Sequence, residues 1–250
     1  MRIMLLTAAI MMATLPAFAN DCYSLSPPEG YSFSDLEDCT IESGLITIMN
    51  EEGHYGFASA AGEVIIPPQY DEAWSFQEGF ALVRKDKLWG YIRPDGSYLV
   101  KPIYTDAWGF GDGLARVQRK GKYGFINGQG KEVITPKYDD GSQWFNEYRA
   151  AVAINNKWGV IDTTGKTIIP TTYDYASNAY SGRIVVGKKG ADGDLRYGYA
   201  DIHGNLVIKP TYSYASDFSR GFAYVISDDW EGYIDTYGNP VDEKVDFNDL

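Results

Sequence analysis

The sequence predicts an all-β protein made of tandem three-stranded antiparallel meanders that stack as an open, twisted solenoid. An aromatic-glycine pair recurs about every 34 residues, short β-branched and aromatic runs alternate with turn signals, and helical spacing of apolar residues is absent. A closed six-bladed, propeller-like ring is the alternative. We favour the open form because a three-stranded blade would be thin and neither terminus offers a missing strand.

Two glycine series with identical spacing define the repeat. Successive glycines lie 34, 34, 35, 39 and 34 residues apart in both series, so the period belongs to a whole unit. The first series follows an aromatic residue and comprises Gly56, Gly90, Gly124, Gly159, Gly198 and, in a weakened copy, Gly232. The second series comprises Gly62, Gly96, Gly130, Gly165, Gly204 and Gly238.

Each unit contains three expected strands and one well-marked turn. In one unit the strands fall at 80–83, 89–92 and 98–100. The turn between the second and third strands opens with Asp or Asn and ends with Gly, as in Asp162 to Gly165. The first side chain can accept hydrogen bonds from the turn backbone, and the glycine takes a positive φ.

The glycine after each aromatic residue indicates a close approach, because glycine otherwise weakens a strand. We expect the ring of a tyrosine that follows the third strand to lie across each glycine; these tyrosines are Tyr70, Tyr104, Tyr138, Tyr173 and Tyr212. Asp71, Asp139 and Asp174 come directly after three of them, and we expect these carboxylates to bond amides of the next turn.

These residues form one compound pattern: aromatic-Gly-[FYV]-[IA], then D-x-x-G, then V-I-x-P-x-Y-D, then F-x-x-G-[LF]-A-x-V. The pattern resembles the WG, or KWG, β-repeat family, with about six units over residues 44–240. The resemblance implies a β-rich array and no particular chemistry. The fourth unit departs from it with an extra residue in 170–173 and a longer loop at 187–196, and the sixth lacks the aromatic residue directly before Gly232.

The chain ends are expected to be processed and capped. Residues 1–19 combine one basic residue with an apolar run and an Ala-x-Ala ending, which is typical of a signal peptide cleaved after Ala19. The mature chain is therefore expected to be periplasmic or secreted, without membrane insertion. Residues 20–43 are expected to form an N-terminal cap closed by a disulfide between Cys22 and Cys39, and residues 241–250 an acidic, solvated tail.

The charge balance restricts the partners. The chain carries a net charge of −12, which becomes −13 when Arg2 leaves with the signal peptide. Nucleic acids and anionic membrane surfaces attract proteins through clustered Lys and Arg, so neither is an expected partner. A protein or an envelope glycan is expected instead, and solubility alone is the simpler explanation of the charge.

Three tryptophans outside the glycine series are the candidate ligand-binding residues. Trp74, Trp108 and Trp144 lie in corresponding connecting segments, while later units carry Ser177 and Ser216 there. On one face of the array the indoles would form a stacking platform for sugar rings or an anchor row for a peptide. Packing between units is the competing interpretation.

The sequence contains no recognised catalytic motif, and no cofactor is expected. We therefore expect an exported, non-enzymatic interaction scaffold. One alternative is a hydrolase or lyase of envelope polysaccharide or peptidoglycan that uses clustered carboxylates. Another is a calcium-dependent binding module that uses Asp192 and Asp194 in the long loop, against the simpler interpretation of a hairpin insertion.

Overall fold

The computed structural model describes residues 25–34 and 42–241, which are built almost wholly of antiparallel strands. The predictions for the signal peptide, for the disulfide between Cys22 and Cys39 and for the tail beyond Val241 lie outside the described residues. Over the described ranges, no helix has the length and apolar character needed to cross a membrane.

The strands form six sheets in chain order. Sheet 1 contains β1 (Tyr31–Phe33), β2 (Leu45–Asn50), β3 (Tyr55–Ser59) and β4 (Val64–Tyr70), with a 3₁₀ turn, η2 (Glu42–Gly44), before β2. Sheet 2 contains β5 (Glu72–Ala73), β6 (Ala81–Lys85), β7 (Leu88–Ile92) and β8 (Tyr98–Tyr104). Sheet 3 contains β9 (Asp106–Gly111), β10 (Leu114–Arg119), β11 (Lys122–Asn127) and β12 (Glu132–Tyr138).

The remaining three sheets continue the same order. Sheet 4 contains β13 (Asp140–Gly141), β14 (Arg149–Ile154), β15 (Lys157–Asp162) and β16 (Thr167–Tyr173). Sheet 5 contains β17 (Tyr175–Tyr180), β18 (Arg183–Lys189), β19 (Leu195–Asp201) and β20 (Leu206–Tyr212). Sheet 6 contains β21 (Tyr214–Ala215), β22 (Phe222–Ile226) and β23 (Glu231–Asp235).

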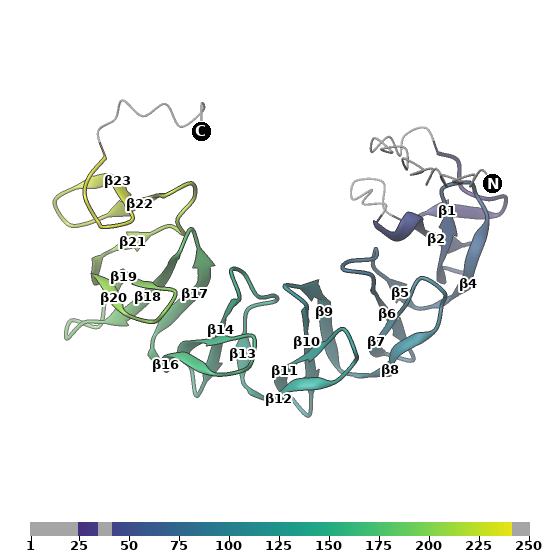
Figure 1. Cartoon of the computed structure of the whole chain (residues 1–250), viewed down its shortest axis with the longest axis horizontal. Helices are drawn as coiled ribbons and strands as arrows, with labels where there is room; N and C mark the ends of the chain where they lie inside the picture. Colours follow the sequence, from purple (N-terminus) through teal and green to yellow (C-terminus); the bar gives the residue numbers. More distant parts are fainter. Residues whose placement is uncertain (1–24, 35–41, 242–250) are drawn as a thin grey trace, which may run out of the picture.

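The six sheets lie side by side along an open arc (Figure 1). The first and last sheets are separated by the open side of the arc, so the open form is confirmed and the closed ring is wrong. In sheets 2 and 3 the first strand lies toward the concave side and the last strand toward the convex side (Figure 1). Residues on or just after the first strands therefore lie toward the concave side.

Five of the six sheets have one strand more than the expected three. The segment after each proline-tyrosine motif forms a short first strand of the next sheet, which is only two residues long in β5, β13 and β21. In sheet 1 the N-terminal segment supplies this strand, because β1 pairs with β2 at Tyr31 and Asn50. The expectation that neither terminus contributes a strand was therefore wrong.

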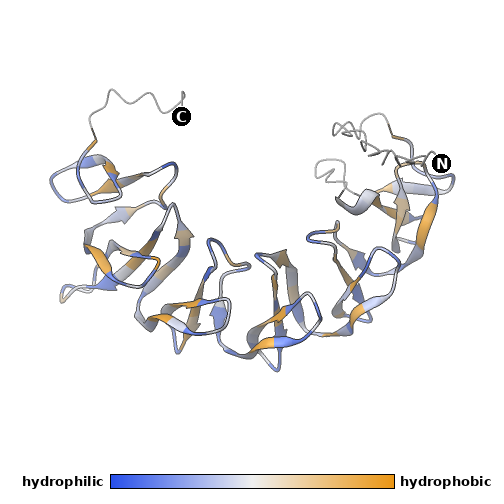
Figure 2. Ribbon diagram, in the orientation of Figure 1, coloured by the Kyte–Doolittle hydropathy of each residue, from blue (hydrophilic) through white to orange (hydrophobic). Residues whose placement is uncertain are grey.

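The hydrophobic core is divided into five clusters, each between two successive sheets. Between sheets 1 and 2, for example, Phe57 and Tyr70 pack with Phe76 and Ile92, and the Phe57 and Phe76 rings meet edge to face with centroids 4.9 Å apart. Figure 2 shows the hydrophobic residues gathered on the strands and hydrophilic residues on many of the loops. Each sheet is thus stabilised by its neighbours, as in other repeat arrays.

Glycine is needed after each aromatic residue because the backbone of the last strand lies against it. The expectation that a tyrosine ring lies there was wrong. A Cβ on Gly90 would lie 2.6 Å from the nitrogen of Pro102, because the last strand of the sheet bulges over the glycine. The same contact with the last strand recurs at Gly56, Gly124, Gly159 and Gly198. The tyrosine of the motif pairs instead with the aromatic residue before the glycine, as Tyr104 does with Trp89.

The predicted turn chemistry is confirmed. The Asp162 carboxylate accepts hydrogen bonds from the amides of Thr164 and Lys166 at 2.9 and 3.0 Å, and Gly165 has a φ of 82°. The carboxylates after the tyrosines also bond the next turn. Asp139 accepts from the Asn155 amide at 2.8 Å, and Asp174 and Asp71 accept from the equivalent amides of their own units.

The connections between first and second strands link one sheet to the next. Glu78 accepts a hydrogen bond from the Gly113 amide at 3.0 Å, Asp112 from the Tyr148 amide at 3.2 Å and Glu147 from the Gly182 amide at 2.9 Å. Each carboxylate therefore reaches the corresponding connection about 35 residues further on, and these bonds fix the spacing of neighbouring sheets on the side of the first strands.

Within the described residues sheet 6 has three strands, and the ring of Trp230 covers the glycine of its incomplete motif. A Cβ on Gly232 would lie 2.6 Å from Cζ2 of Trp230, where the other sheets place the bulged last strand. Past the turn, Pro240 forms a bridge with Ile234, the pairing that Glu132 makes with Ile126 in sheet 3, and the residues after Val241 lie outside the described ones.

Candidate binding groove

The three candidate tryptophans line a single pocket. Trp74 follows β5, Trp108 lies in β9 and Trp144 follows β13, and together with Phe110 and Gln77 they surround a cavity of about 330 Å³. Trp74 is 40% exposed and Trp144 is 48% exposed. The competing interpretation, that all three indoles are buried between units, therefore does not describe these two side chains.

The pocket is shaped by ring contacts and by two glycines. The Trp74 and Trp108 rings meet edge to face with centroids 5.4 Å apart. A Cβ on Gly109 would overlap the side-chain amide of Gln77, and a Cβ on Gly111 would lie 3.2 Å from Cβ of Trp144. Glycine at these two positions lets Gln77 and Trp144 approach β9.

Trp144 does not occupy the position in its repeat that Trp74 occupies, although the sequence suggested that it does. The Trp74 amide donates to the Leu82 carbonyl at 2.9 Å, and the corresponding bond in sheet 4 runs from Ser142 to Ala151, also at 2.9 Å. Ser142 is therefore the structural equivalent of Trp74, and Trp144 lies two residues later. Its indole closes the pocket as a separate wall.

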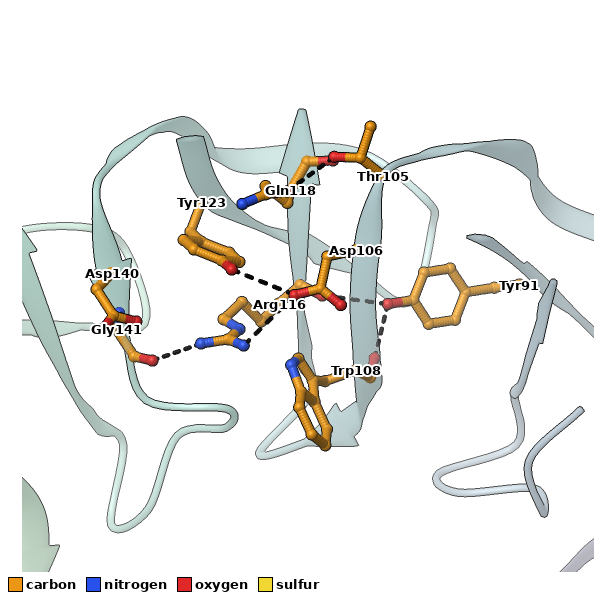
Figure 3. A network of polar contacts seen from close by, with 9 residues as sticks. All are labelled: Tyr91, Thr105, Asp106, Trp108, Arg116, Gln118, Tyr123, Asp140 and Gly141. Carbon is orange, nitrogen blue, oxygen red and sulfur yellow. Dashed lines mark hydrogen bonds and ion pairs between the residues drawn. The ribbon is translucent and has the colours of Figure 1, made fainter. Parts of the chain in front are cut away.

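A buried arginine supports Trp108 from behind (Figure 3). Arg116 is only 6% exposed, and its guanidinium carbon lies 5.5 Å from the Trp108 ring centroid and 4.4 Å from that of Tyr123. Its Nη1 donates to the Gly141 carbonyl at 2.5 Å, and its Nη2 lies 3.8 Å from Asp106. Burial lowers the pKa of Arg116, which the nearby Tyr123 and Asp106 oppose, and an arginine keeps its charge at any physiological pH.

The backbone at Trp108 is fixed by the preceding sheet. The Tyr91 hydroxyl donates to the Trp108 carbonyl at 2.6 Å (Figure 3). Because Tyr91 is almost wholly buried, this bond holds the first strand of sheet 3 against sheet 2. The Tyr199 hydroxyl donates an equivalent hydrogen bond to the Ser216 carbonyl at 2.8 Å, so the same contact recurs between sheets 5 and 6.

A second pocket adjoins the first and shares Trp144 with it. This cavity of about 310 Å³ is formed by sheets 4, 5 and 6. Its aromatic walls are Trp144, Trp158, Tyr175 and Tyr180, and Asp217 is its carboxylate. We call this set of five residues the aromatic cage.

A third cavity, of about 520 Å³, lies on sheet 6 and shares Asp217 with the aromatic cage. Its walls include Arg220, Tyr224 and Tyr233. The three adjoining cavities extend from sheet 2 to sheet 6, each sharing one lining residue with the next, and we call them together the aromatic groove.

Asp217 has an unusual environment within the groove. Its side chain reaches solvent, but the surrounding rings withdraw water from the carboxyl, and this burial raises the pKa of Asp217, while a hydrogen bond from Ser177 opposes the rise. In the described part of the chain, no Lys, Arg or His forms an ion pair with Asp217.

The comparisons with known proteins agree with this architecture. The family described as WG containing repeat matches at residues 55–89, 89–123, 123–158, 158–190 and 197–229. The chain belongs to the WG repeat family. The curated protein sequences contain no significant match to it.

The fold of this WG array is similar to that of one solved β-sheet structure. One crystal structure, of a eukaryotic initiation factor, superposes with a TM-score of 0.52 at 11% identity, covering 80% of this chain and 61% of that one. This chain thus spans about three fifths of the initiation-factor structure, and the likeness concerns the fold alone. Hsv2 from Kluyveromyces lactis gives a TM-score of 0.43 at 10% identity, covering 78% of this chain and 71% of that one, which is too low to support an argument.

The candidate calcium residues lie in an extended hairpin of the WG array. The loop at 187–196 continues the pairing of β18 with β19 as far as Lys189 and Leu195. Asp192 and Asp194 lie 3.5 and 3.6 Å from the guanidinium of Arg196, and the Asp194 amide donates to Asp192 at 3.0 Å. Within the described residues, no group of three potential metal ligands is found. These contacts favour a hairpin insertion.

The hydrolase or lyase hypothesis requires two neighbouring carboxylates in one cleft. Among the residues that line the three described cavities, Asp217 is the one carboxylate. The groove therefore offers a single carboxylate among aromatic rings.

Sequence reasoning missed Arg116 and the aromatic cage. Arg116 stands at the strand position where sheets 2, 4 and 5 have Leu82, Ala151 and Val185, so a basic residue there was an available signal. The cage gave no such signal, because Trp158 belongs to the glycine motif and Asp217 comes from a different unit.

Proposed function

We propose that this protein is an exported, non-enzymatic interaction scaffold that binds a protein or an envelope glycan in the aromatic groove. The observation that carries the proposal is the convergence of Trp74, Trp108 and Trp144 on one pocket, with two of the indoles 40% exposed or more. Tryptophan left partly open to water beside a cavity is typical of binding surfaces, because the ring offers a large apolar area and an N–H donor.

Rigidity of the groove supports the proposal. Trp108 is held by the Tyr91 hydroxyl and by the Arg116 guanidinium. Trp74 is held by the hydrogen bond that its backbone N–H donates to the Leu82 carbonyl, and by contact with the Trp108 ring. A site that is ordered before the ligand arrives loses little conformational entropy on binding. The concave side of a repeat array also offers an extended surface.

Export is supported by the composition of residues 1–19, and the acidic net charge favours a neutral or basic ligand over an anionic one. Glycan rings and peptide side chains both stack on indoles. The proposal therefore includes both ligand classes, and the first experiment separates them.

The experiment is affinity capture on the immobilised mature protein, with envelope proteins and fragmented envelope glycans supplied in separate runs. We expect one of the two classes to be retained by the parent and lost by a Trp74→Ala/Trp108→Ala/Trp144→Ala variant. Tyr237→Ala is the matched control, because Tyr237 is an aromatic residue that is 76% exposed outside the groove.

Circular dichroism establishes that each variant is folded. If the triple variant unfolds, the pair Trp74→Ala and Trp144→Ala replaces it, since these two side chains are the more exposed. Equal retention of a ligand by the parent and a folded groove variant would contradict the proposal.

A further inference from the structure

The aromatic cage has walls that suit a cation. Four rings, from Trp144, Trp158, Tyr175 and Tyr180, line an open cavity of about 310 Å³, and its lining includes no Lys or Arg. The faces of aromatic rings attract cations through their quadrupole, and the attraction strengthens when the cation is partly desolvated. Asp217 adds a carboxylate at the same cavity.

In the preceding unit, the position equivalent to the aromatic cage is occupied by a guanidinium of the protein itself. Arg116 lies against the ring of Tyr123, at 4.4 Å, and donates to the carbonyl of Gly141 on the first strand of the next sheet. Asp106 lies 3.8 Å away as its counter-charge. This arrangement places a flat cation between an aromatic-glycine ring and the next first strand (Figure 3).

The strand register shows that the aromatic cage is structurally equivalent to the site occupied by the Arg116 guanidinium. Arg116 pairs with Phe125, the residue after Gly124, and Ala151 pairs with Val160, the residue after Gly159. Ala151 is therefore the equivalent of Arg116. By the same alignment Trp158 corresponds to Tyr123, and Ala176 corresponds to Gly141.

Both Trp158 and Ala176 line the aromatic cage. The cage thus contains the equivalents of Tyr123 and Gly141. The residue equivalent to Arg116 is Ala151, whose side chain is only a methyl group. The Asn178 side chain forms the inner boundary, because its Oδ1 accepts from the Ala151 amide at 3.0 Å and its Nδ2 donates to the Trp144 carbonyl at 2.9 Å.

We propose that the aromatic cage binds the guanidinium of an arginine side chain presented by a partner protein. The inference rests on the proposed function and names the chemistry of its ligand. The guanidinium stacks on the ring of Trp158, as that of Arg116 does on Tyr123, and Asp217 supplies the negative charge. Arginine suits the site better than lysine, because its planar group stacks on rings and donates several hydrogen bonds in fixed directions.

Charge favours this occupant over a neutral sugar. Asp217 forms no ion pair with a basic side chain among the described residues, and its carboxylate, which lines the same cavity as the rings, attracts an incoming cation. The net charge of −12 also attracts a basic partner at long range. A neutral glycan would gain from the rings but not from the carboxylate.

The test is an NMR titration of the mature protein with a short glycine peptide that carries one central arginine. The indole N–H signals of Trp144 and Trp158 report on the cage directly, and that of Trp230 serves as the control outside it. We expect the two cage signals to shift in a saturable way. The same peptide with citrulline, which keeps the shape but removes the charge, is expected to bind at least about tenfold more weakly, the effect of losing a charge-assisted contact.

Two variants locate the binding. Asp217→Asn removes the charge with little change of shape and is expected to weaken arginine-peptide binding about tenfold. Ala151→Arg places a guanidinium in the cage from within and is expected to abolish binding. If Ala151→Arg fails to fold, Asp217→Asn and the citrulline peptide still decide the question.

Three outcomes would overturn the inference: no shift with the arginine peptide, equal binding of the citrulline peptide, or unchanged binding by Asp217→Asn. Failure here is distinct from failure of the proposed function. A partner that is lost by the Trp74→Ala/Trp144→Ala variant but retained by Asp217→Asn leaves the scaffold standing and removes the arginine site.

Discussion

Nη1 of Arg116 donates a hydrogen bond to the carbonyl of Gly141 at 2.5 Å and so ties sheet 3 to sheet 4 directly behind the tryptophan pocket. The same guanidinium lies against the rings of Trp108 and Tyr123. One side chain therefore connects the stability of the array with the shape of the groove.

Arg116→Met should lower the free energy of unfolding by about 2–4 kcal/mol, because it removes a hydrogen bond from a charged donor and two cation–π contacts. Urea denaturation followed by tryptophan fluorescence measures the change. Arg119→Met is the matched control, because the ion pair of Arg119 with Glu132 is exposed and should contribute less than about 1 kcal/mol. Equal effects of the two variants would contradict the structural role given to Arg116.

Gly124→Ala should destabilise the protein severely, by more than about 3 kcal/mol, because the new Cβ would lie 2.5 Å from the nitrogen of Pro136 in the bulged strand. Gly121→Ala is the control. Gly121 has a φ of 73° and nothing within 4 Å of its added Cβ, so the substitution should cost only the roughly 1–2 kcal/mol of a left-handed conformation. Thermal denaturation of both variants tests the difference, and similar melting temperatures would refute the close-approach explanation.

Acid should destabilise the array through the carboxylates that follow the motif tyrosines. The hydrogen bond from Lys122 holds the pKa of Asp139 below its ordinary value, helped by the Asn155 amide, and Lys157 and the Lys189 amide do the same for Asp174. A carboxyl with a lowered pKa in the folded state stabilises the protein above its unfolded pKa of about 3.9, and this contribution disappears as the pH falls through the folded value.

The melting temperature should therefore decrease as the pH falls from about 5 through the lowered pKa values of Asp139 and Asp174. Asp139→Asn/Asp174→Asn should flatten this decrease relative to the parent. A parent and a double variant with parallel pH profiles would show that the two ion pairs do not contribute to the pH dependence.

Binding of an arginine peptide should weaken as the pH is lowered toward the raised pKa of Asp217, because the cation requires the ionised carboxylate. The tyrosines that face Asp217, namely Tyr175, Tyr180 and Tyr199, have pKa values raised by burial and titrate far above this range. The charged side chain that shares a cavity with Asp217 is that of Arg220. Peptide titrations at several pH values between 4 and 8 measure the effect. A pH-independent affinity would exclude Asp217 as the counter-charge.

Asp217→Asn should also raise the melting temperature of the free protein at neutral pH. The sign follows from the raised pKa of Asp217, because a carboxyl that is harder to ionise in the folded state destabilises that state at pH values where it is charged. A variant that is more stable yet binds the peptide less well is the pattern expected of a binding residue. A lower melting temperature would instead indicate a structural role for the carboxylate.

Much of the fold was predictable because the repeat encodes it locally. The turn at Asp162 to Gly165 needs one acceptor and one positive φ, and both are readable in the sequence. The extra first strands were not predictable, since β5, β13 and β21 are two residues long and show no alternation. Their pairing depends on the next strand lying alongside, which is tertiary information.

The groove was predictable in part, and for a similar reason. Periodicity identified Trp74, Trp108 and Trp144 as related residues, and the structure places them around one pocket. The register of Trp144 was wrong because the connection in sheet 4 is longer, so that Ser142 takes the repeat position. Asp217 escaped notice because its neighbours in the cage come from sheets 4 and 5 and only the folded array brings them together.

The most direct test of the aromatic groove is oxidative footprinting of the tryptophans with the captured ligand present and absent, with mass spectrometry as the readout. Trp74, Trp144 and Trp230 are 40%, 48% and 39% exposed, so their starting reactivities should be similar, and Trp230 does not line the groove. We predict that the ligand protects Trp74 and Trp144 and leaves Trp230 unchanged. Protection of Trp230 alone, or of none of the three while the ligand is bound, would contradict the assignment of the groove as the binding surface.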